Sequence, residues 1–449
     1  METINAFPGY EYVPFGEDKK PHNMYKGEDV GFGGYVFAIP GMYGRTVCFD
    51  VSGMHPASIR ALNYLGAYTK NYADLVDART AIKHKDFDSA KKMLNGKLAP
   101  YLTDESKAKD LSKALKLAQN SVYGLTSANF DNPFRDSRNV NNIVALRGAL
   151  FMVNLKHEIQ SRGFTVIHCK TDSIKVVEPS DEIFNFIIDY GKKYGYNFEV
   201  EHVFDKICLV NNAVYIAKLS SDDPENPGKW TATGTQFQVP YVFKKLFSKE
   251  PIEFDDLCET KSVTSALYLD MNENLPDVSE AEKVKTLRKT SEDQISKSEF
   301  NLMNGKSSHG FKWSDVSDEE LDDMIASGHN YIFIGKVGRF CPIKPGHGGG
   351  LLCREAEDKK TGEKKYVSAT GAKGYRWLES ELVKELGKED SIDRSYYDTL
   401  ANEAIDAISK YGDFYQFVSD DSPNQVEAPW FNPSEPWSDE HETTAFDVR

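Results

Sequence analysis

Two aspartates of this 449-residue chain stand where a carboxylate could do chemistry. Asp50 ends a short apolar run and is followed at once by the turn-forming residues Ser52 and Gly53. Asp172 lies between two apolar runs, at the bend of an expected β-hairpin. Taken alone, each aspartate is more simply explained as an ordinary turn residue or helix cap.

A third segment carries polar groups at helical spacing. It reads Lys-Leu-Ala-Gln-Asn-Ser-Val-Tyr-Gly and is expected at the end of a helix. The cation, amide, phenol and glycine are spaced i, i+4, i+7 and i+8, so they share one helical face. These residues are Lys116, Asn120, Tyr123 and Gly124. A solvated helix face would also explain them.

The three segments together supply the parts of a nucleotidyl-transfer site. Two carboxylates on converging strands can hold a pair of Mg²⁺ ions about 3.5–4 Å apart. A nearby cation can neutralise a triphosphate, because Mg²⁺ takes few protein ligands and shares the phosphate oxygens. The sequence therefore predicts that Asp50, Asp172 and Lys116 act at one site.

The elements that position these residues follow from apolar spacing and from capping residues. The expected elements are a strand at 45–50, helices at 57–94, 107–121 and 140–162, and a hairpin at 164–177. The second helix is expected to begin near Thr103 and to end at Gly124. Residues 240–327 are expected to be mostly helical, 331–376 rich in strand, and 377–411 helical.

Bulk composition excludes few classes of protein. No run approaches 18 apolar residues, and the N-terminus lacks the pattern of a secretory signal, so a cytoplasmic protein without a membrane span is expected. Six scattered cysteines indicate reduced thiols, with neither a zinc site nor a disulfide framework.

The net charge of -15 hides an uneven distribution. Residues 331–377 hold ten Lys and Arg against four Asp and Glu, whereas residues 419–449 hold eight acidic residues and one basic. Interleaved basic and aromatic residues suit a grip on a nucleic-acid backbone, although a solvated surface remains an alternative. Candidate DNA contacts here are Lys336, Arg339 and Lys344. The glycine-rich loop at 346–350 lacks the Lys-Ser/Thr of an ATPase P-loop.

The three segments resemble motifs A, B and C of family B DNA polymerases, in that order. The amino-acid sequence in and around them is most similar to that of polymerases from tailed bacteriophages. Motif B, Lys-x-x-x-Asn-Ser-x-Tyr-Gly, is matched in full by residues 116–124. Motif A corresponds to Asp-Val-Ser-Gly-Met-His-Pro-Ala at 50–57, and motif C to Lys-Thr-Asp-Ser at 170–173. The Tyr-x-Gly-Gly segment that precedes motif A keeps its glycines at Gly33 and Gly34.

The resemblance implies roles for these positions. Asp50, Asp172 and the Val51 carbonyl would hold two Mg²⁺ ions, with Mn²⁺ as an alternative. Lys116 would contact the phosphates of the incoming nucleotide, and Asn120, Tyr123 and Gly124 would line the nascent base pair. Lys113 and Lys109, one and two turns upstream, are weaker candidates for the same contacts, and an exposed helix face explains them equally well.

Three positions depart from the family pattern. Lys170 replaces the first acid of motif C. Because side chains alternate along a strand, Lys170 is expected on the same face as Asp172, near the metal site. Its ammonium is therefore expected to contact a phosphate of the primer or nucleotide. His55 stands where the family has the tyrosine that excludes a ribose, and a packed structural histidine is the alternative. Tyr215 keeps the tyrosine of a Lys-x-Tyr element that grips primer-template DNA, but the lysine is lost.

The expected fold is α+β, a right-hand polymerase with a ferredoxin-like antiparallel palm and helical fingers and thumb. The expected parts are a lead-in at 1–44, palm at 45–61 and 139–240, fingers at 62–138, thumb at 241–330, a basic module at 331–418 and an acidic tail at 419–449. Few residues precede Gly33, and no Asp-x-Glu motif occurs among them, so a 3′–5′ exonuclease is expected on a separate chain or removed from this one.

The expected function is DNA-directed DNA polymerase in phage genome replication, with primer-template DNA, dNTPs and other replication proteins as partners. One rival is a catalytically weakened primer-template binding subunit, inactivated by Lys170. A second rival is a reverse transcriptase or primase-like palm, against which the complete motif B argues. The acidic tail, with its tryptophans and phenylalanines, is expected to be disordered or to recruit a replication partner.

Overall fold

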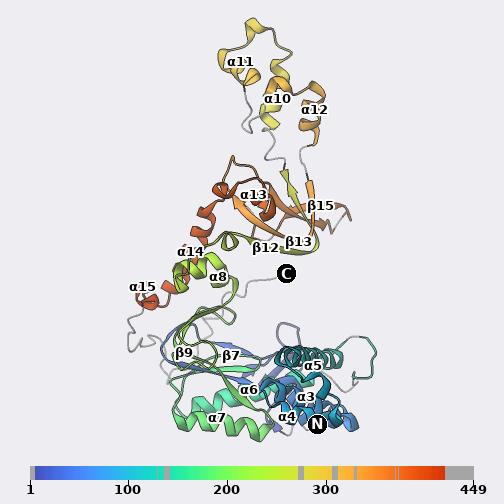
Figure 1. The fold of residues 1–449 in the computed structure, drawn as a ribbon, viewed down its shortest axis with the longest axis vertical. Coiled ribbons are helices and arrows are strands. Elements are labelled where there is room, and N and C mark those ends of the chain that lie inside the picture. The colour runs from blue at the N-terminus through green and yellow to red at the C-terminus, as the bar shows by residue number, and fades with distance from the viewer. Residues whose placement is uncertain are drawn as a thin grey trace. The chain divides into compact units, whose positions relative to one another are not determined.

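The structure, a computed structural model, is a mixed α+β chain. It describes residues 6–128, 130–135, 142–271, 278–305, 312–327, 331–359, 361–369, 371–372 and 374–419. The chain divides into two compact units, one formed by Met1–Gly234 with Ile408–Arg449 and the other by Thr235–Ala407. Each unit has a sheet and a hydrophobic core of its own (Figure 1).

An eight-stranded antiparallel sheet forms the centre of the first unit. Its order is β11-β10-β9-β6-β8-β7-β4, and β5 pairs with β9 outside this path. The strands are β4 (Val36–Ala38), β5 (Gly41–Tyr43), β6 (Thr46–Val51), β7 (Val166–Lys170), β8 (Ser173–Val177), β9 (Phe198–Leu209), β10 (Tyr215–Leu219) and β11 (Trp230–Thr233). A small sheet of β1 (Glu11–Val13), β2 (His22–Tyr25) and β3 (Glu28–Asp29) precedes it along the chain.

The two faces of the eight-stranded sheet bury different side chains. Val47, Phe49 and Val51 belong to the larger core, which they share with α6 (Ile143–Ser161) and α7 (Asp181–Tyr194) (Figure 1). Cys48 belongs instead to a smaller cluster formed by β5, β7, β9 and β10. Because side chains alternate along a strand, Asp50 shares the face of Cys48, opposite to the two helices.

Among the described residues of the first unit, four α-helices lie between β6 and α6. They are α2 (Met54–Ala61), α3 (Thr69–Lys83), α4 (Phe87–Lys92) and α5 (Glu105–Thr126). The single helical stretch expected at 57–94 is thus broken into three helices. Asp104 caps α5 by accepting the Lys107 N–H, close to the predicted start.

The expectation that Gly124 ends this helix is wrong. Helix α5 continues to Thr126, whose hydroxyl donates to the Tyr123 carbonyl at 2.7 Å. The last turn is held by packing, since Val122 and Tyr123 lie against a buried cluster of α2, α3 and α6 residues. Tertiary contacts therefore outweigh the roughly 1 kcal/mol by which an internal glycine weakens a helix.

Helix α5 is fixed against α3 by buried polar contacts. The Gln119 side-chain amide donates to the Leu75 carbonyl at 3.2 Å, and the Tyr72 hydroxyl donates to the Gln119 carbonyl at 3.4 Å. Gln119 and Leu115 are buried, whereas Lys116 and Asn120 are exposed. The motif B face of the helix is thereby held in one orientation.

The second unit contains a five-stranded antiparallel sheet of order β15-β14-β12-β13-β16. Its strands are β12 (Glu259–Asp270), β13 (Tyr331–Ile343), β14 (Leu351–Glu357), β15 (Lys364–Ser368) and β16 (Arg376–Glu379). Its helices are α8 (Thr235–Gln238), α9 (Pro240–Phe243), α10 (Val278–Leu287), α11 (Lys297–Asn304), α12 (Asp318–Ser327), α13 (Ser380–Glu385) and α14 (Arg394–Ser409).

Two expectations for this part of the chain are wrong. The stretch at 240–327 is not uniformly helical, because β12 is a twelve-residue strand, and residues 377–379 lie in β16 rather than in a helix. Since β12 pairs with β13, the sheet also crosses the boundary expected between residues 330 and 331.

The last described helix, α15 (Phe414–Val418), returns to the first unit. Its Phe417 ring packs edge-on against Trp230 at 5.7 Å, and the Lys206 ammonium donates to the Ser419 carbonyl at 2.6 Å. The aromatic tail residues at 430, 431, 437 and 446 and the basic residues at 360 and 373 lie outside the described residues. Within the described ranges, no helix is long and apolar enough to cross a membrane.

Candidate active site

The expected hairpin is confirmed, and its bend is only two residues long. Lys170 at the end of β7 pairs with Ser173 at the start of β8, which leaves Thr171 and Asp172 in the bend. The Asp172 carbonyl accepts the Val51 N–H at 2.9 Å, and Asp50 lies directly opposite Ser173. The backbone therefore brings Asp50 and Asp172 together at one edge of the site.

The two carboxyl groups share a poorly solvated, negative environment. Burial, then the charges of Asp172 and Glu201, raise the pKa of Asp50 to about 7. Burial and Glu201 also raise the pKa of Asp172, although its own backbone N–H and the Lys175 ammonium act in the opposite direction. An added cation would relieve this accumulation of negative charge.

Two further carboxylates stand beside this pair on β9, and the sequence analysis missed them. Glu199 pairs with Asp50 across the sheet and forms ion pairs with Lys83 at 2.6 Å and His84 at 3.0 Å. Burial alone would raise the pKa of Glu199, but these partners lower it. Glu201 is the extra residue of a bulge opposite β6. Their place beside Asp50 depends on the register between β6 and β9, which no local sequence pattern specifies.

A buried cation lies beneath the carboxylates. The Lys175 side chain is 4 % exposed, and its ammonium lies 3.4 Å from His168 Nδ1 and 5.1 Å from the centre of the Tyr215 ring. Burial and Lys175 lower the pKa of His168 to about 4, so the imidazole is neutral. Its Nε2–H then donates to the Asn212 carbonyl at 3.1 Å, and Nδ1 accepts from Lys175. This arrangement places Tyr215 beside Lys175, two residues after motif C.

His55 and Tyr123 connect motif A with motif B. Their rings stack in parallel, with centroids 3.9 Å apart and planes 5° from one another. Burial lowers the pKa of His55, which keeps the ring neutral. Asn142, at the start of α6, donates to the Tyr123 hydroxyl at 3.3 Å and to the Phe32 carbonyl at 3.4 Å. Tyr123 is thus held directly beside the motif A helix α2.

The other motif B residues lie on the exposed side of α5. Lys109, Lys113, Lys116, Asn120 and Gly124 are all exposed, and Lys113 pairs with Asp110 at 3.7 Å. On the neighbouring helix α3, the Nε atom of Arg79 is buried and has no hydrogen-bond partner among the described residues. Arg79 is a candidate cation that sequence spacing did not reveal.

The glycine segment before motif A packs directly on the hairpin bend. A Cβ atom added to Gly34 would lie 2.7 Å from the Cβ of Thr171, which is far inside contact distance. The Tyr35 carbonyl accepts the Thr171 N–H at 2.8 Å. Thr171 has a φ of 56°, a conformation that a β-branched residue rarely adopts. Gly34 and Tyr35 thus hold the strained residue next to Asp172, whereas Gly33 has open space around it.

Tyr35 is anchored by a buried ionic cluster. Its hydroxyl donates to Glu28, and the Lys156 ammonium donates to both Glu28 oxygens at 2.7 Å and to the Tyr35 oxygen at 2.8 Å. His157 lies 2.6 Å from Glu28. Burial alone would raise the pKa of Glu28, but His157, Lys156 and Tyr35 together lower it to about 2. Glu28 is therefore ionised at neutral pH and ties α6 to the segment that supports the bend.

Lys170 is placed differently from the sequence expectation. The left-handed backbone of Thr171 interrupts the strand, so the alternation that would put Lys170 and Asp172 on one face does not apply. Lys170 is exposed at the end of β7.

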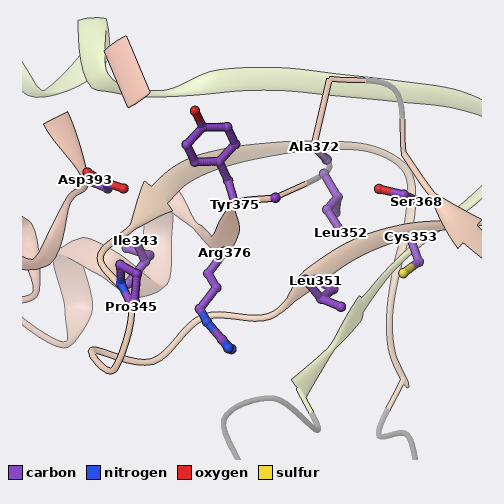
Figure 2. Close-up of a pocket in the computed structure, with 11 residues that line it drawn as sticks. Ile343, Pro345, Leu351, Leu352, Cys353, Ser368, Ala372, Tyr375, Arg376 and Asp393 are labelled. Atoms are coloured by element: carbon purple, nitrogen blue, oxygen red, sulfur yellow. The ribbon is translucent and has the colours of Figure 1, made fainter. Parts of the chain in front are cut away.

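The candidate DNA contacts of the second unit differ in their surroundings. Arg339 pairs with the Asp255 carboxylate at 3.3 Å, and the Lys344 ammonium donates to the Asp390 carbonyl at 2.7 Å. Lys336 is exposed on β13. A hollow of about 500 Å³ in the same unit is mostly apolar, with Arg376 and Asp393 as its charged side chains (Figure 2). It contains none of the residues expected at the active site.

Within the described residues, no group of three or more His, Cys, Asp or Glu side chains is placed to hold a metal ion unaided. Asp50 and Asp172 are oxygen donors of the kind that Mg²⁺ prefers, but two carboxylates leave most of its coordination positions to water and phosphate oxygens. The donor set therefore fits a metal that arrives with a phosphorylated substrate.

Comparisons with known proteins give limited information about the family. No protein-family model matches the chain, and no curated protein matches it. Among solved structures, it is similar to the family B DNA polymerase from the hyperthermophilic archaeon Pyrobaculum calidifontis, with a TM-score of 0.39 and 12 % sequence identity. The match covers 90 % of this chain and 47 % of that polymerase, so the chain spans about half its length. A likeness this weak does not establish a shared family.

Proposed function

We propose that this chain is a DNA-directed DNA polymerase of the family B, tailed-phage type, which adds dNTPs to a primer 3′-hydroxyl on a DNA template. The observation that carries the proposal is the meeting of Asp50 and Asp172 at the end of β6 and the bend of the β7–β8 hairpin. The right-hand arrangement belongs to the proposal: palm at 45–61 and 139–240, fingers at 62–138 and thumb at 241–330.

The carboxylates fit the handling of divalent cations. Asp50 and Asp172 are half-buried among like charges, and both have raised pKa values. They would hold Mg²⁺, or Mn²⁺ in its place, with the Val51 carbonyl as a further oxygen donor. When bound, two such ions stabilise the charge on the attacking and leaving oxygens of an in-line phosphoryl displacement.

The chain's own residues then position the nucleotide. Lys116 on the exposed face of α5 would neutralise the triphosphate, and Arg79 on α3 is a second candidate for this contact. The stacked pair of His55 and Tyr123 would form a wall beside the sugar and base of the incoming nucleotide. Asn120 and Gly124 extend the same helical face.

The template and primer would be held by other parts of the chain. Tyr215, fixed beside Lys175, would face the primer-template duplex, and Lys170 would contact a phosphate of the primer or nucleotide. Other replication proteins would complete the machinery.

Primer extension tests this proposal. Asp172→Asn keeps the shape of the side chain but removes its charge, so extension with Mg²⁺ should fall by about 10³-fold. Asp189→Asn is a matched control, because Asp189 is an exposed carboxylate on α7 of the same unit. If Asp172→Asn extends primers as fast as the wild type, the assignment of the active site is wrong.

A second candidate function rests on Lys170, which stands where the family has an acid. A catalytically weakened subunit would bind primer-template DNA without extending it. Binding and extension by the wild type therefore separate the two candidates. Lys170→Asp, which restores an acid there, should switch extension on only under the second candidate.

A further inference from the structure

Two cysteines of the second unit lie in contact across its sheet. The Sγ atoms of Cys258 and Cys341 are 3.4 Å apart, although 83 positions separate them in the sequence. Cys258 directly precedes β12, and the pairing of Glu259 with Phe340 places it opposite Cys341 on β13. An S–S bond is about 2.05 Å long, so a change in side-chain rotamer of modest size would close the gap.

The surroundings give the two thiols different characters. Arg339 and Lys384 lie near Cys258, both held by Asp255, at 3.3 Å and 4.0 Å respectively. The contact between the thiols lowers the pKa of Cys258 and raises that of Cys341, and the two cations favour a thiolate at either sulfur. Cys258, which is not fully buried, is assigned as the thiol that reacts first.

Neither residue takes part in the proposed polymerase site, which lies in the other unit. Cys258 is 6 % exposed and Cys341 is fully buried, so a small oxidant reaches Cys258 first. A second thiol that is already in contact with the first favours a disulfide over further oxidation of a single sulfur.

We propose that Cys258 and Cys341 form a reversible oxidation site, at which a hydroperoxide converts the two thiols into a disulfide that joins the start of β12 to β13. The Cys258 thiolate attacks one oxygen of the O–O bond; the S–O bond forms, the O–O bond breaks, and the departing alkoxide leaves as an alcohol after taking a proton. Cys258 is then a sulfenic acid.

The second step closes the disulfide. The Cys341 sulfur attacks the Cys258 sulfur; the S–S bond forms and the S–O bond breaks. The departing hydroxide takes the proton from Cys341 and leaves as water. In sum, two thiols lose two electrons and two protons, and the hydroperoxide is reduced to one alcohol and one water. A dithiol reductant reverses the reaction by thiol–disulfide exchange.

The site can be tested on the full chain without any substitution. The reduced protein is exposed to one equivalent of hydrogen peroxide, blocked with N-ethylmaleimide, digested without reductant and analysed by mass spectrometry. A peptide pair linking Cys258 to Cys341, two hydrogens lighter than the sum of its parts, is expected to be the dominant cross-link. If both cysteines carry maleimide after a dose that fully oxidises free glutathione, the proposal is wrong.

Variants test the order of the two steps. In Cys341→Ala, Cys258 should stop at a sulfenic acid that dimedone labels, whereas in Cys258→Ala, Cys341 should stay reduced. Cys353→Ala is the matched control, because Cys353 is buried in the same sheet but pairs with Tyr268, and its disulfide yield should equal that of the wild type. Dimedone labelling of Cys341 instead of Cys258 would overturn the assigned roles.

Disulfide formation should also raise the thermal stability of the second unit. Oxidation of the wild type should raise the melting temperature of the second unit by about 5–10 °C, because the bond closes a long loop of the unfolded chain. The shift should vanish on addition of a dithiol and be absent in both single-cysteine variants. An unchanged melting temperature in protein that mass spectrometry shows to be cross-linked would contradict the structural placement of the pair.

Discussion

The carboxylates of the first unit and the cations of the second unit present opposite electrostatic situations. Asp50 and Asp172 lie half-buried beside other acids, and their pKa values are raised. Many cations of residues 331–377 already have partners within the protein: Lys364 pairs with Glu355 and Lys365 with Asp358. Clustered carboxylates that are shielded from water are stabilised when a cation binds to them. Exposed cations that already pair with carboxylates of the protein gain little from a bound ligand.

This difference weakens the case for DNA binding by the basic segment and strengthens the case for a site at the two aspartates. Ten basic residues in one segment suggested a DNA grip, but Arg339 and Lys344 make contacts within their own unit. The two aspartates, each of which resembled an ordinary turn residue, are the positions where the fold concentrates unfavourable charge.

After the loss expected for Asp172→Asn, the largest effect is expected at Gly34, where backbone strain supports a carboxylate. Gly34→Ala should lower primer extension by about 10²-fold, because the added methyl group collides with Thr171 and displaces Asp172. Thr171→Gly relieves both the collision and the positive φ, so the double variant should recover most of the lost activity. Rates of the two single variants and the double variant measure this coupling, and simple additivity of the losses would contradict it.

Neutralising one carboxylate should raise the stability of the first unit but lower the stability of the second. The raised pKa of Asp50 means that the metal-free folded state binds a proton more tightly than the unfolded state, so stability falls as pH rises from about 4 to about 7. Asp50→Asn should therefore stabilise the metal-free protein by about 2 kcal/mol at pH 8 and have no effect near pH 4.

Asp256 of the second unit provides the contrast. It pairs with Lys244 at 2.8 Å and accepts the Glu253 N–H at 2.7 Å. Asp256→Asn should destabilise its unit at pH 8, because Lys244 loses its charged partner. Denaturant unfolding of both variants at the two pH values would show the signs. A loss of stability in Asp50→Asn at pH 8 would contradict the electrostatic description of the site.

A smaller effect is expected on the nucleotide side. Lys116→Met should raise the KM for dNTPs about 10-fold, because one charge-assisted contact to the triphosphate is lost. Lys113→Met is the matched control one turn away, since Lys113 already pairs with Asp110. Steady-state kinetics at saturating primer-template would separate the two. Equal KM values for both variants would place the triphosphate elsewhere.

The smallest effect should come from the second unit. Lys364→Met should change the affinity for primer-template DNA by less than about 2-fold and leave its salt dependence nearly unchanged, because Lys364 is an exposed side chain already paired with Glu355. Fluorescence titrations at two salt concentrations test this. A large drop in affinity would instead support the hypothesis that the basic segment at 331–377 binds DNA.

The sequence predicted the elements whose pattern is local. The hairpin at 164–177 and the helix near 140–162 appear because apolar runs and terminal glycines mark them directly. Strand β12 was missed because polar residues dominate Glu259–Ser265, so its two-residue periodicity carries little apolar contrast. The end of α5 was misplaced because packing of Tyr123 on His55, a contact between distant residues, extends the helix past its glycine.

The candidate site divides in the same way. Asp50, Asp172 and Lys116 could be proposed from the sequence because each lies in a motif of a few residues. Glu201, Lys175 and the Cys258–Cys341 pair depend on register between strands far apart in the sequence, which no local pattern specifies. The left-handed backbone conformation of Thr171 could not be predicted from the sequence either, because β-branched residues rarely adopt it.

The contact between Gly34 and Thr171 has a consequence for how this sequence can diverge. The two positions lie far apart in the chain, yet a side chain at one excludes a branched side chain at the other. Descendants of this protein should therefore change them together: a glycine at 171 permits alanine or serine at 34, while threonine at 171 permits glycine alone. Correlated substitution of this one pair would record, in sequence, the geometry that supports Asp172.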